Sequence, residues 1–199
     1  MPRRDSELCA GEHYHFYNRG NNRERIFYER GNYLFFLRRL REYCAPVVDV
    51  VACCLMPTHY HLLARVRERA DASEPSQVSA GVSRAMMRLS VSHTKAMNKK
   101  YDRVGALFQG AYRYKHVSEN DYLVHLSRYI HLNPVIDGLV ERPEYWEFSS
   151  YREYMGLREG TLARPGVVLD QFRSTDDYRE FVESYIAENR TIIADLLFA

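Results

Sequence analysis

Two histidines separated by one residue are the first side chains in this chain that could do chemistry together. His59 and His61 flank Tyr60 in an apolar stretch that is predicted to form a strand. Residues two apart on a strand point to the same side of the sheet, so the two imidazoles could bind one metal ion. The motif alone is weak evidence, because the chain has 8 histidines and His13-Tyr14-His15 repeats the pattern.

A second group of polar side chains lies on one face of a predicted helix. His125, Tyr129 and Asn133 are spaced four residues apart, so they share a face. The apolar stripe of this helix lies on another side and consists of Leu123, Leu126 and Ile130. Two interpretations stay open for the polar face. It could serve a site, or it could be structural, with Tyr129 as a half-buried ring and Asn133 as a C-cap.

Basic residues are concentrated in the middle of the chain. The net charge is only +2, but residues 79–116 hold eight basic residues and one acidic residue, whereas residues 137–199 hold seven and thirteen. Cations interleaved with aromatic rings are what a nucleic-acid surface needs, although a solvated helix face has the same composition. The candidate DNA contacts in this block are Arg84, Arg88, Lys95, Lys99, Lys100, Arg113 and Lys115.

Length and composition exclude several classes of protein. The chain has 199 residues, of which 46% are hydrophobic and 27% charged, which is ordinary for a globular protein with one main domain. No apolar run reaches the roughly 18 residues of a membrane helix, and the polar start lacks the apolar region of a signal peptide. The 4 cysteines include the adjacent pair Cys53-Cys54, which favours reduced thiols and a cytoplasmic protein.

The periodicity of the sequence predicts the elements that must position these residues. We predict strands over 13–19, 26–28, 47–55, 59–66 and 107–117. We predict helices over 33–43, over 78–100 after a polar linker at 71–77, from an N-cap at Ser118 to about residue 133, after Ser149, and over 176–189. This order of elements predicts an α+β fold, an antiparallel sheet with helices packed on it.

Five segments, taken together, resemble a known family. They are Tyr17–Asn22, Met56–Leu63, Gly105–Gly110, Arg128–Val135 and Phe148–Tyr151. In this order they are similar to the IS200-like transposases of the HUH endonuclease class, which use one catalytic tyrosine, and to their REP-associated branch. The resemblance covers about residues 12–155 and implies a ferredoxin-like (RRM-like) HUH domain over 1–155, with an acidic C-terminal extension over 156–199. Tyr60 departs mildly from the hydrophobic residue of the HUH motif.

The resemblance also implies roles for single residues. His59, His61 and Asn133 fall on the ligands of a divalent cation, Mg²⁺ or Mn²⁺, and Tyr129 falls on the nucleophile. Because it lies one turn before Tyr129, His125 could help to move a proton, and a structural role for His125 stays open. The family acts on single-stranded DNA near hairpins, and on this basis Asn18, Arg19 and Arg23 of the N-terminal hairpin are candidates for reading a guide sequence. The alternative is that these polar residues only stabilise the turn.

Three functions remain possible at this stage. The first is a transposase that nicks and joins DNA through a 5′-phosphotyrosine, as a monomer or as a homodimer that exchanges the tyrosine helix. The second is a domesticated relative that binds hairpin DNA without cutting it. The third is a metal-dependent phosphodiesterase that uses water and needs no tyrosine.

Overall fold

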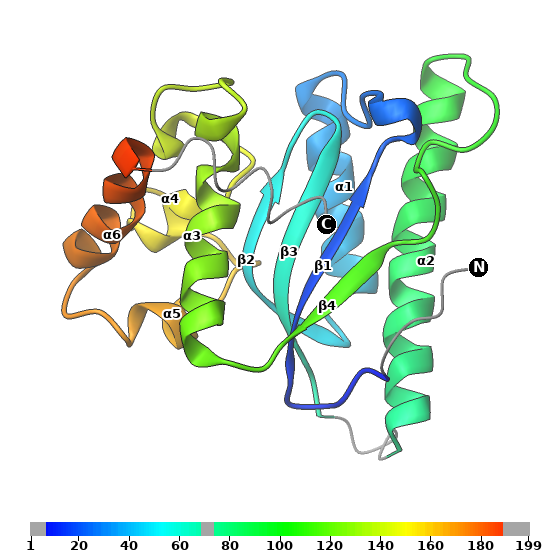
Figure 1. The fold of residues 1–199 in the computed structure, drawn as a ribbon. Helices are drawn as coiled ribbons and strands as arrows, with labels where there is room; N and C mark the ends of the chain where they lie inside the picture. The colour runs from blue at the N-terminus through cyan, green and yellow to red at the C-terminus, as the bar shows by residue number, and fades with distance from the viewer. Residues whose placement is uncertain (1–6, 69–73, 189–199) are drawn as a thin grey trace.

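Four antiparallel strands form the centre of the molecule. The computed structural model describes residues 7–68 and 74–188. The strands are β1 (His13–Arg19), β2 (Val48–Leu55), β3 (His59–Val66) and β4 (Arg113–Val117). They are arranged in the order β2-β3-β1-β4 (Figure 1), and each neighbouring pair is antiparallel. This sheet with helices packed on it confirms the predicted α+β fold.

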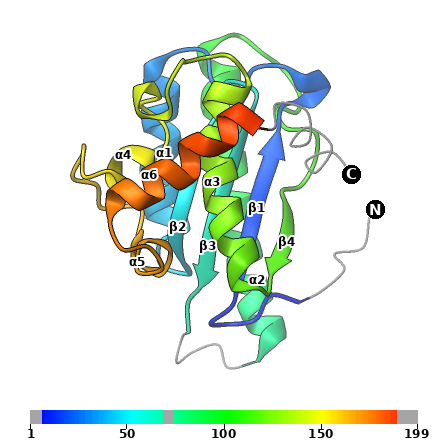
Figure 2. The same ribbon diagram turned by 60° about the vertical axis from the view of Figure 1, so that its left-hand side comes forward.

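The helices divide between the two faces of the sheet. Helices α1 (Arg30–Tyr43) and α2 (Pro75–Lys100) cover one face, and α3 (Asn120–Ile136) covers part of the other (Figures 1 and 2). The alternation of β3 explains the division. Tyr60 and Leu62 belong to the core that contains α1 and α2, whereas Leu63 belongs to the core that contains α3. His59 and His61 alternate with the first pair and therefore lie on the α3 side.

Of the predicted strands, one is absent and another is shorter than predicted. Residues 26–28 form no strand, because both edges of β1 are already paired, with β3 and β4. Instead, Ile26 and Phe27 donate their backbone N–H groups to the carbonyl of Pro57. The strand predicted over 107–117 is reduced to Arg113–Val117, and the preceding segment reaches the sheet through a single bridge between Gly20 and Phe108.

Several helix boundaries also differ from the prediction, including the start of α1, which lies three residues before the predicted one. Helix α2 begins at Pro75, within the predicted linker, because proline is favoured in the first turn. Glu119 rather than Ser118 is the N-cap of α3, without a side-chain hydrogen bond. Helix α3 also continues through Pro134 to Ile136, since a proline this close to the end removes only one helical hydrogen bond. Asn133 is consequently inside the helix and is not a C-cap.

Several short elements follow α3, and the described part of the chain ends in a longer helix. Besides η1 (Asn21–Arg23), the structure has η2 (Pro143–Tyr145), α4 (Tyr151–Tyr154), α5 (Gly166–Leu169) and α6 (Thr175–Glu188). Ser150, and not Ser149, is the N-cap of α4. The final helix was predicted to reach residue 189, which lies outside the described residues. No helix in the described ranges is long and apolar enough to cross a membrane.

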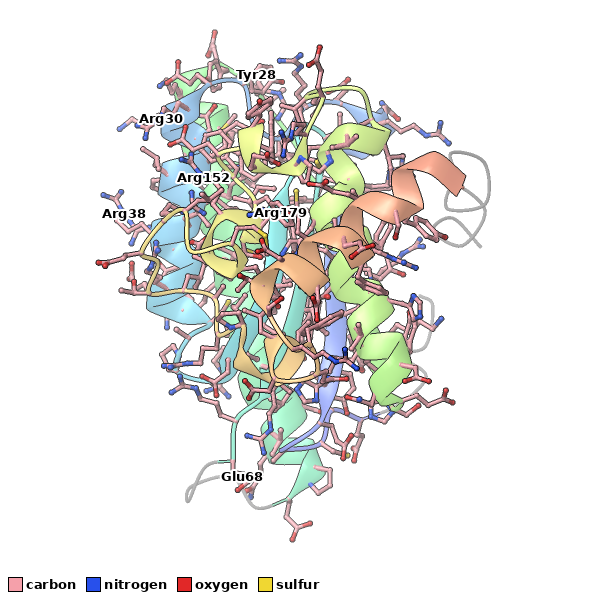
Figure 3. All side chains as sticks on the ribbon, turned by 90° about the vertical axis from the view of Figure 1, so that its left-hand side faces the viewer. Tyr28, Arg30, Arg38, Glu68, Arg152 and Arg179 are labelled. Atoms are coloured by element: carbon pink, nitrogen blue, oxygen red, sulfur yellow. The ribbon has the colours of Figure 1, made fainter. Side chains whose placement is uncertain are left out.

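In the described part of the segment after residue 156, α5 and α6 pack on α3. Helix α6 crosses α3 on the outer side of the molecule (Figure 3), and Val168, Tyr178 and Val182 are fully buried in the core shared with α3. The Tyr178 hydroxyl lies 2.8 Å from Nδ1 of His131 and 3.0 Å from Oγ of Ser127. The proposed boundary at residue 155 is therefore not a break in the packing.

This contact leads to a prediction about stability. Tyr178→Phe should lower the free energy of unfolding by about 1–3 kcal/mol, because it leaves the buried Nδ1 atom of His131 without a partner. Urea denaturation at neutral pH measures the change. Tyr145→Phe, at a side chain that is 60% exposed, is the matched control and should change the free energy by less than about 0.5 kcal/mol. Equal stability of the two variants would contradict the docking of α6 through this hydroxyl.

A buried histidine in α2 predicts a pH dependence of stability. His93 donates from Nε2 to the carbonyl of Ile26 (2.8 Å), and its ring lies among Phe27, Phe36 and Phe108. Burial lowers the pKa of His93 to about 4. Between about pH 6.5, its unfolded value, and pH 4 the unfolded chain therefore binds more protons, and stability falls as the pH falls.

Between pH 7 and pH 5, protonation of this single group in the unfolded chain should lower the free energy of unfolding by about 2 kcal/mol. Urea denaturation at the two pH values should therefore show a smaller loss in His93→Leu than in the wild type, by about that amount. His116→Gln is the control, since His116 is exposed and paired with Glu12. An unchanged pH sensitivity in His93→Leu would show that His93 titrates normally.

Candidate active site

Four side chains from β3 and α3 converge on the α3 side of the sheet. The Tyr129 hydroxyl donates to Oδ1 of Asn133 at 3.1 Å and lies 3.5 Å from Nε2 of His61. The ring centroids of His59 and His61 are 5.0 Å apart. The four-residue spacing of α3 and the two-residue spacing of β3 thus meet at one place, as the sequence predicts.

A third histidine, which the sequence analysis set aside, orients His61. Nε2 of His15 lies 2.8 Å from Nδ1 of His61, and both rings are buried. The two rings stack with their centroids 5.0 Å apart. When the Nδ1–H of His61 donates to His15, Nε2 of His61 keeps a lone pair facing Tyr129. The signal in the sequence was the second His-x-His motif, which lies on the strand that pairs with β3.

Neighbouring groups also fix the other two candidate ligands. Oγ1 of Thr58 lies 2.9 Å from Nδ1 of His59. The Nδ2 group of Asn133 donates to the backbone carbonyl of Tyr129 at 2.9 Å, which leaves Oδ1 of Asn133 directed at the phenol. Each candidate ligand therefore has one atom held by the protein and one atom turned toward the site, as is typical of metal ligands.

Burial sets the protonation of the site. It lowers the pKa of His61 well below its ordinary value, with His15 and His59 adding to the effect. Burial also lowers the pKa of His59 and raises that of Tyr129, while the hydrogen bond between Tyr129 and Asn133 opposes the rise. At neutral pH the imidazoles are therefore uncharged and able to bind a cation, and the phenol keeps its proton.

The donor set fits a divalent cation only if Asn133 takes part. Within the described ranges, no three His, Cys, Asp or Glu side chains gather as a metal-binding group. Two imidazole nitrogens and the amide oxygen of Asn133 do gather, and such mixed nitrogen and oxygen donors suit Mn²⁺ and Mg²⁺. This set is supported by the hydrogen bonds that His15 and Thr58 make to Nδ1 of His61 and of His59. These bonds leave Nε2 of each imidazole for the cation.

The predicted DNA contacts fall into two groups. Arg19 lies opposite His59 in the pairing of β1 with β3. Arg113 and Lys115 on β4 lie opposite Tyr17 and His15 in the pairing of β1 with β4. Because residues directly opposite each other in a sheet share a face, these three cations lie on the side of His61.

The other cations lie on the far side of the sheet. Helix α2 packs with α1 on the opposite face, and Arg88 lies over the Tyr43 ring while Lys100 pairs with Glu29. The structure therefore brings only part of the basic block to the site, because one sheet separates its two ends, and DNA binding by the block stays a prediction. The residues that the structure does not bring to the site are Arg84, Arg88, Lys95, Lys99 and Lys100.

Three further predicted residues have other surroundings. Asn18 is buried and uses its amide to bond the carbonyl of Gly110 and the N–H of Arg19, so it holds the backbone and is not available to read DNA. His125 bonds Arg128 and packs on Phe181 of α6, which directs it away from the phenol. Arg23 is exposed in η1, with a positive φ of 59°.

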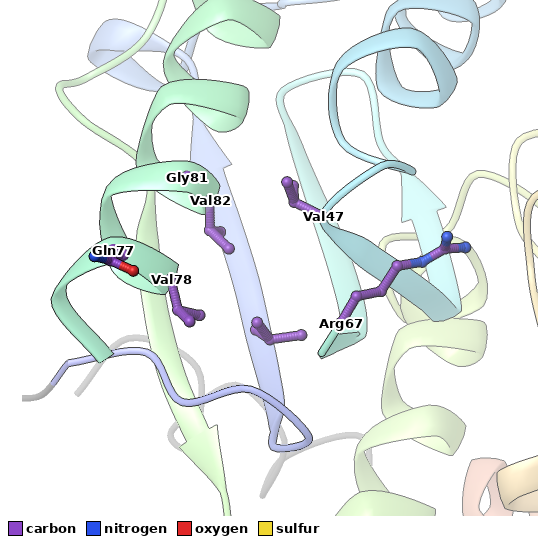
Figure 4. Close-up of a pocket in the computed structure, with 7 residues that line it drawn as sticks. Val47, Arg67, Gln77, Val78, Gly81 and Val82 are labelled. Carbon is purple, nitrogen blue, oxygen red and sulfur yellow. The ribbon is translucent and has the colours of Figure 1, made fainter. Parts of the chain in front are cut away.

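A cavity elsewhere in the molecule is too small to compete with this site. It has a volume of about 10 Å³, which is room for about one water molecule. It lies between the first turns of α2 and the strand ends near Val47 and Arg67 (Figure 4).

Fold and site together define a class of protein in which a sheet histidine pair faces a helix tyrosine. The family model described as "Transposase IS200 like" matches residues 10–133, more than half of the chain. The chain therefore belongs to the IS200-like transposase family. No curated protein matches it.

Two solved structures are similar to the chain. One is a REP-associated tyrosine transposase bound to a REP hairpin, with a TM-score of 0.60 and 18% identity over 82% of this chain and 94% of that one. It supports the fold. The other is a candidate transposase from Deinococcus radiodurans, with a TM-score of 0.40 and 19% identity over 64% of this chain and 95% of that one, a similarity too low to bear on the fold.

Proposed function

We propose that this transposase nicks and rejoins single-stranded DNA through a covalent bond to Tyr129. The observation that carries the proposal is the position of the phenol oxygen between Oδ1 of Asn133 and Nε2 of His61. A nucleophile placed beside two candidate metal ligands is what transfer of a phosphodiester needs. The direct test is mass spectrometry for a DNA-linked peptide that contains Tyr129.

The chemistry conserves the energy of the phosphodiester bond. The Tyr129 oxygen forms a bond to phosphorus, and the bond from phosphorus to the 3′-oxygen breaks. The phenol loses its proton and the departing 3′-oxygen gains one, which leaves a 5′-phosphotyrosine and a free 3′-hydroxyl. A second DNA 3′-hydroxyl can reverse the reaction, so joining needs no nucleotide triphosphate.

His59, His61 and Asn133 would hold the divalent cation, Mg²⁺ or Mn²⁺. When bound, the cation would supply charge neutralisation at the phosphate oxygen and would favour loss of the phenol proton. This second effect opposes the rise that burial causes in the pKa of Tyr129. The hydrogen bonds that His15 and Thr58 make to the Nδ1 atoms of His61 and His59 fix the tautomer and the orientation of each neutral imidazole. Little reorganisation is therefore needed when the phosphate arrives.

Hairpin DNA is the proposed substrate. The REP-associated transposase with the same fold is bound to a REP hairpin, and the sequence segments shared with that branch include Tyr17–Asn22 and Arg128–Val135. Tyr129 meets the histidines of its own chain, which favours a monomer as the catalytic unit over a dimer that exchanges α3.

The separation of the cations predicts which of them hold DNA. Replacing Arg113 and Lys115 together with glutamine should weaken binding of single-stranded DNA and reduce the slope of log affinity against log salt by about 1.4. The matched control replaces Lys95 and Lys99 of α2, two exposed cations on the other face, and should change neither quantity. Fluorescence anisotropy at several salt concentrations measures both. A larger effect from the α2 pair would place the DNA on the opposite face.

Two alternative functions make different predictions. A domesticated hairpin-binding protein would bind DNA and form no adduct at all. A phosphodiesterase that uses water would cleave DNA without Tyr129. The hydrogen bond of Tyr129 to Asn133 favours the transposase over both, because neither alternative requires the phenol at the ligands.

A further inference from the structure

Part of the sheet beside Tyr129 is not covered by a helix. Helix α3 lies over β2 and β3, and in Figure 2 strands β1 and β4 lie to the side of it with no described helix in front of them. The side chains that alternate onto this face from β1 and β4 include Tyr17, Arg113 and Lys115. Arg113 and Lys115 are exposed and Tyr17 is half-buried.

Three aromatic rings, those of Tyr17, His15 and His61, lie close together on this face. Tyr17 is directly opposite His61 in the pairing of β1 with β3. Its ring stacks on His15 with centroids 4.9 Å apart and an interplanar angle of 29°, and it lies 6.2 Å from the His61 ring at the same angle. Tyr17 is thus the most exposed ring of a cluster in which His61 lies 3.5 Å from the Tyr129 hydroxyl.

Positively charged side chains lie beside this cluster of rings. Arg113 is the partner of Tyr17 on β4, and Lys115 is the partner of His15. Arg19 follows two residues later on β1, and burial together with Arg23 and Arg113 lowers its pKa. Cations gathered this closely repel one another, so a bound phosphate chain would relieve the repulsion.

We propose that Tyr17 is a stacking site for one unpaired base of the single-stranded DNA beside the scissile phosphate, with Arg113 and Lys115 bound to the neighbouring phosphates. The inference rests on the proposed function and adds to it a site that holds the strand. A stacked strand advances about 3.4 Å per nucleotide. With the Tyr17 ring 6.2 Å from His61, the base belongs to one of the first nucleotides beside the cleaved bond.

The competing explanation is structural, namely that Tyr17 only supports His15. A thermodynamic cycle that combines one change in the protein with one change in the DNA separates base stacking from a purely structural role. One change removes the ring (Tyr17→Leu), and the other removes the bases, by replacing a short oligothymidylate with an abasic strand of the same length. All proteins carry Tyr129→Phe, so that binding is measured without chemistry.

Tyr17→Leu should weaken binding of the oligothymidylate roughly 5- to 150-fold, the range measured for one stacked base. It should leave binding of the abasic strand unchanged, because only phosphates remain to be held. Tyr17→Phe should restore the affinity. Tyr28→Leu is the matched control, because Tyr28 also lies against a ring, that of Tyr101 with centroids 4.7 Å apart, away from the site, and it should not change either affinity.

A photochemical measurement covers the case in which Tyr17→Leu does not fold. An oligothymidylate that contains one 5-iododeoxyuridine, irradiated with the Tyr129→Phe protein, should form a cross-linked peptide containing Tyr17. Equal losses on both strands in the cycle, or cross-links that avoid Tyr17, would overturn the inference. Absence of a Tyr129 adduct in the wild type together with a positive cycle would overturn the proposed function and leave the stacking site standing.

Discussion

Tyr129→Phe should abolish the covalent protein–DNA adduct and lower cleavage of hairpin-bearing single-stranded DNA by at least about a thousandfold. The change removes one oxygen, the atom that we propose forms the bond to phosphorus. It also removes the hydrogen bond to Asn133. Denaturing gel electrophoresis of labelled DNA, with Mn²⁺ present, measures both products.

The control for this variant is its affinity for DNA. Phenylalanine keeps the ring that packs against His61 with centroids 5.4 Å apart, so binding should stay within about threefold, which is less than 1 kcal/mol. Cleavage that survives in Tyr129→Phe would favour a phosphodiesterase that uses water. A wild-type protein that binds hairpins tightly and never forms an adduct would favour the binding protein.

His61→Leu should have the second-largest effect. It removes the proposed ligand nitrogen that lies 3.5 Å from the phenol oxygen, and a bound cation would contribute several kcal/mol to stabilising charge on the phosphate. Adduct formation should therefore fall roughly a hundredfold or more. Chelation with EDTA should abolish the adduct of the wild type, and added Mn²⁺ should restore it there and not in the variant.

The direct measurement is the affinity for Mn²⁺, by titration calorimetry. His15→Phe keeps a ring against His61 and removes only the hydrogen bond at 2.8 Å, so it should weaken Mn²⁺ binding by about 10- to 100-fold, as is typical for a group that orients a ligand. His116→Gln changes an exposed histidine on β4 and should leave binding unchanged. Mn²⁺ affinity that is equal in the wild type and in His61→Leu would exclude this ligand set.

Much of the site was determined by local sequence periodicity. Side chains two residues apart on a strand share a face, and so do side chains four residues apart on a helix, because backbone geometry fixes both spacings. They place His59 with His61 and Tyr129 with Asn133 in any fold that keeps β3 as a strand and α3 as a helix. The α+β class follows from the order of these elements, and the five segments shared with the IS200-like family identify the side chains that matter.

The tertiary structure decided which distant residues join that site. The sequence places the basic residues in one block, yet the sheet lies between α2 and Tyr129, so only Arg113 and Lys115 of that block share its face. His15 reaches His61 because β1 pairs with β3 in one register, and strand register is fixed by long-range packing. Local patterns set which way a side chain points from its own element, and only the packing of elements sets what it meets.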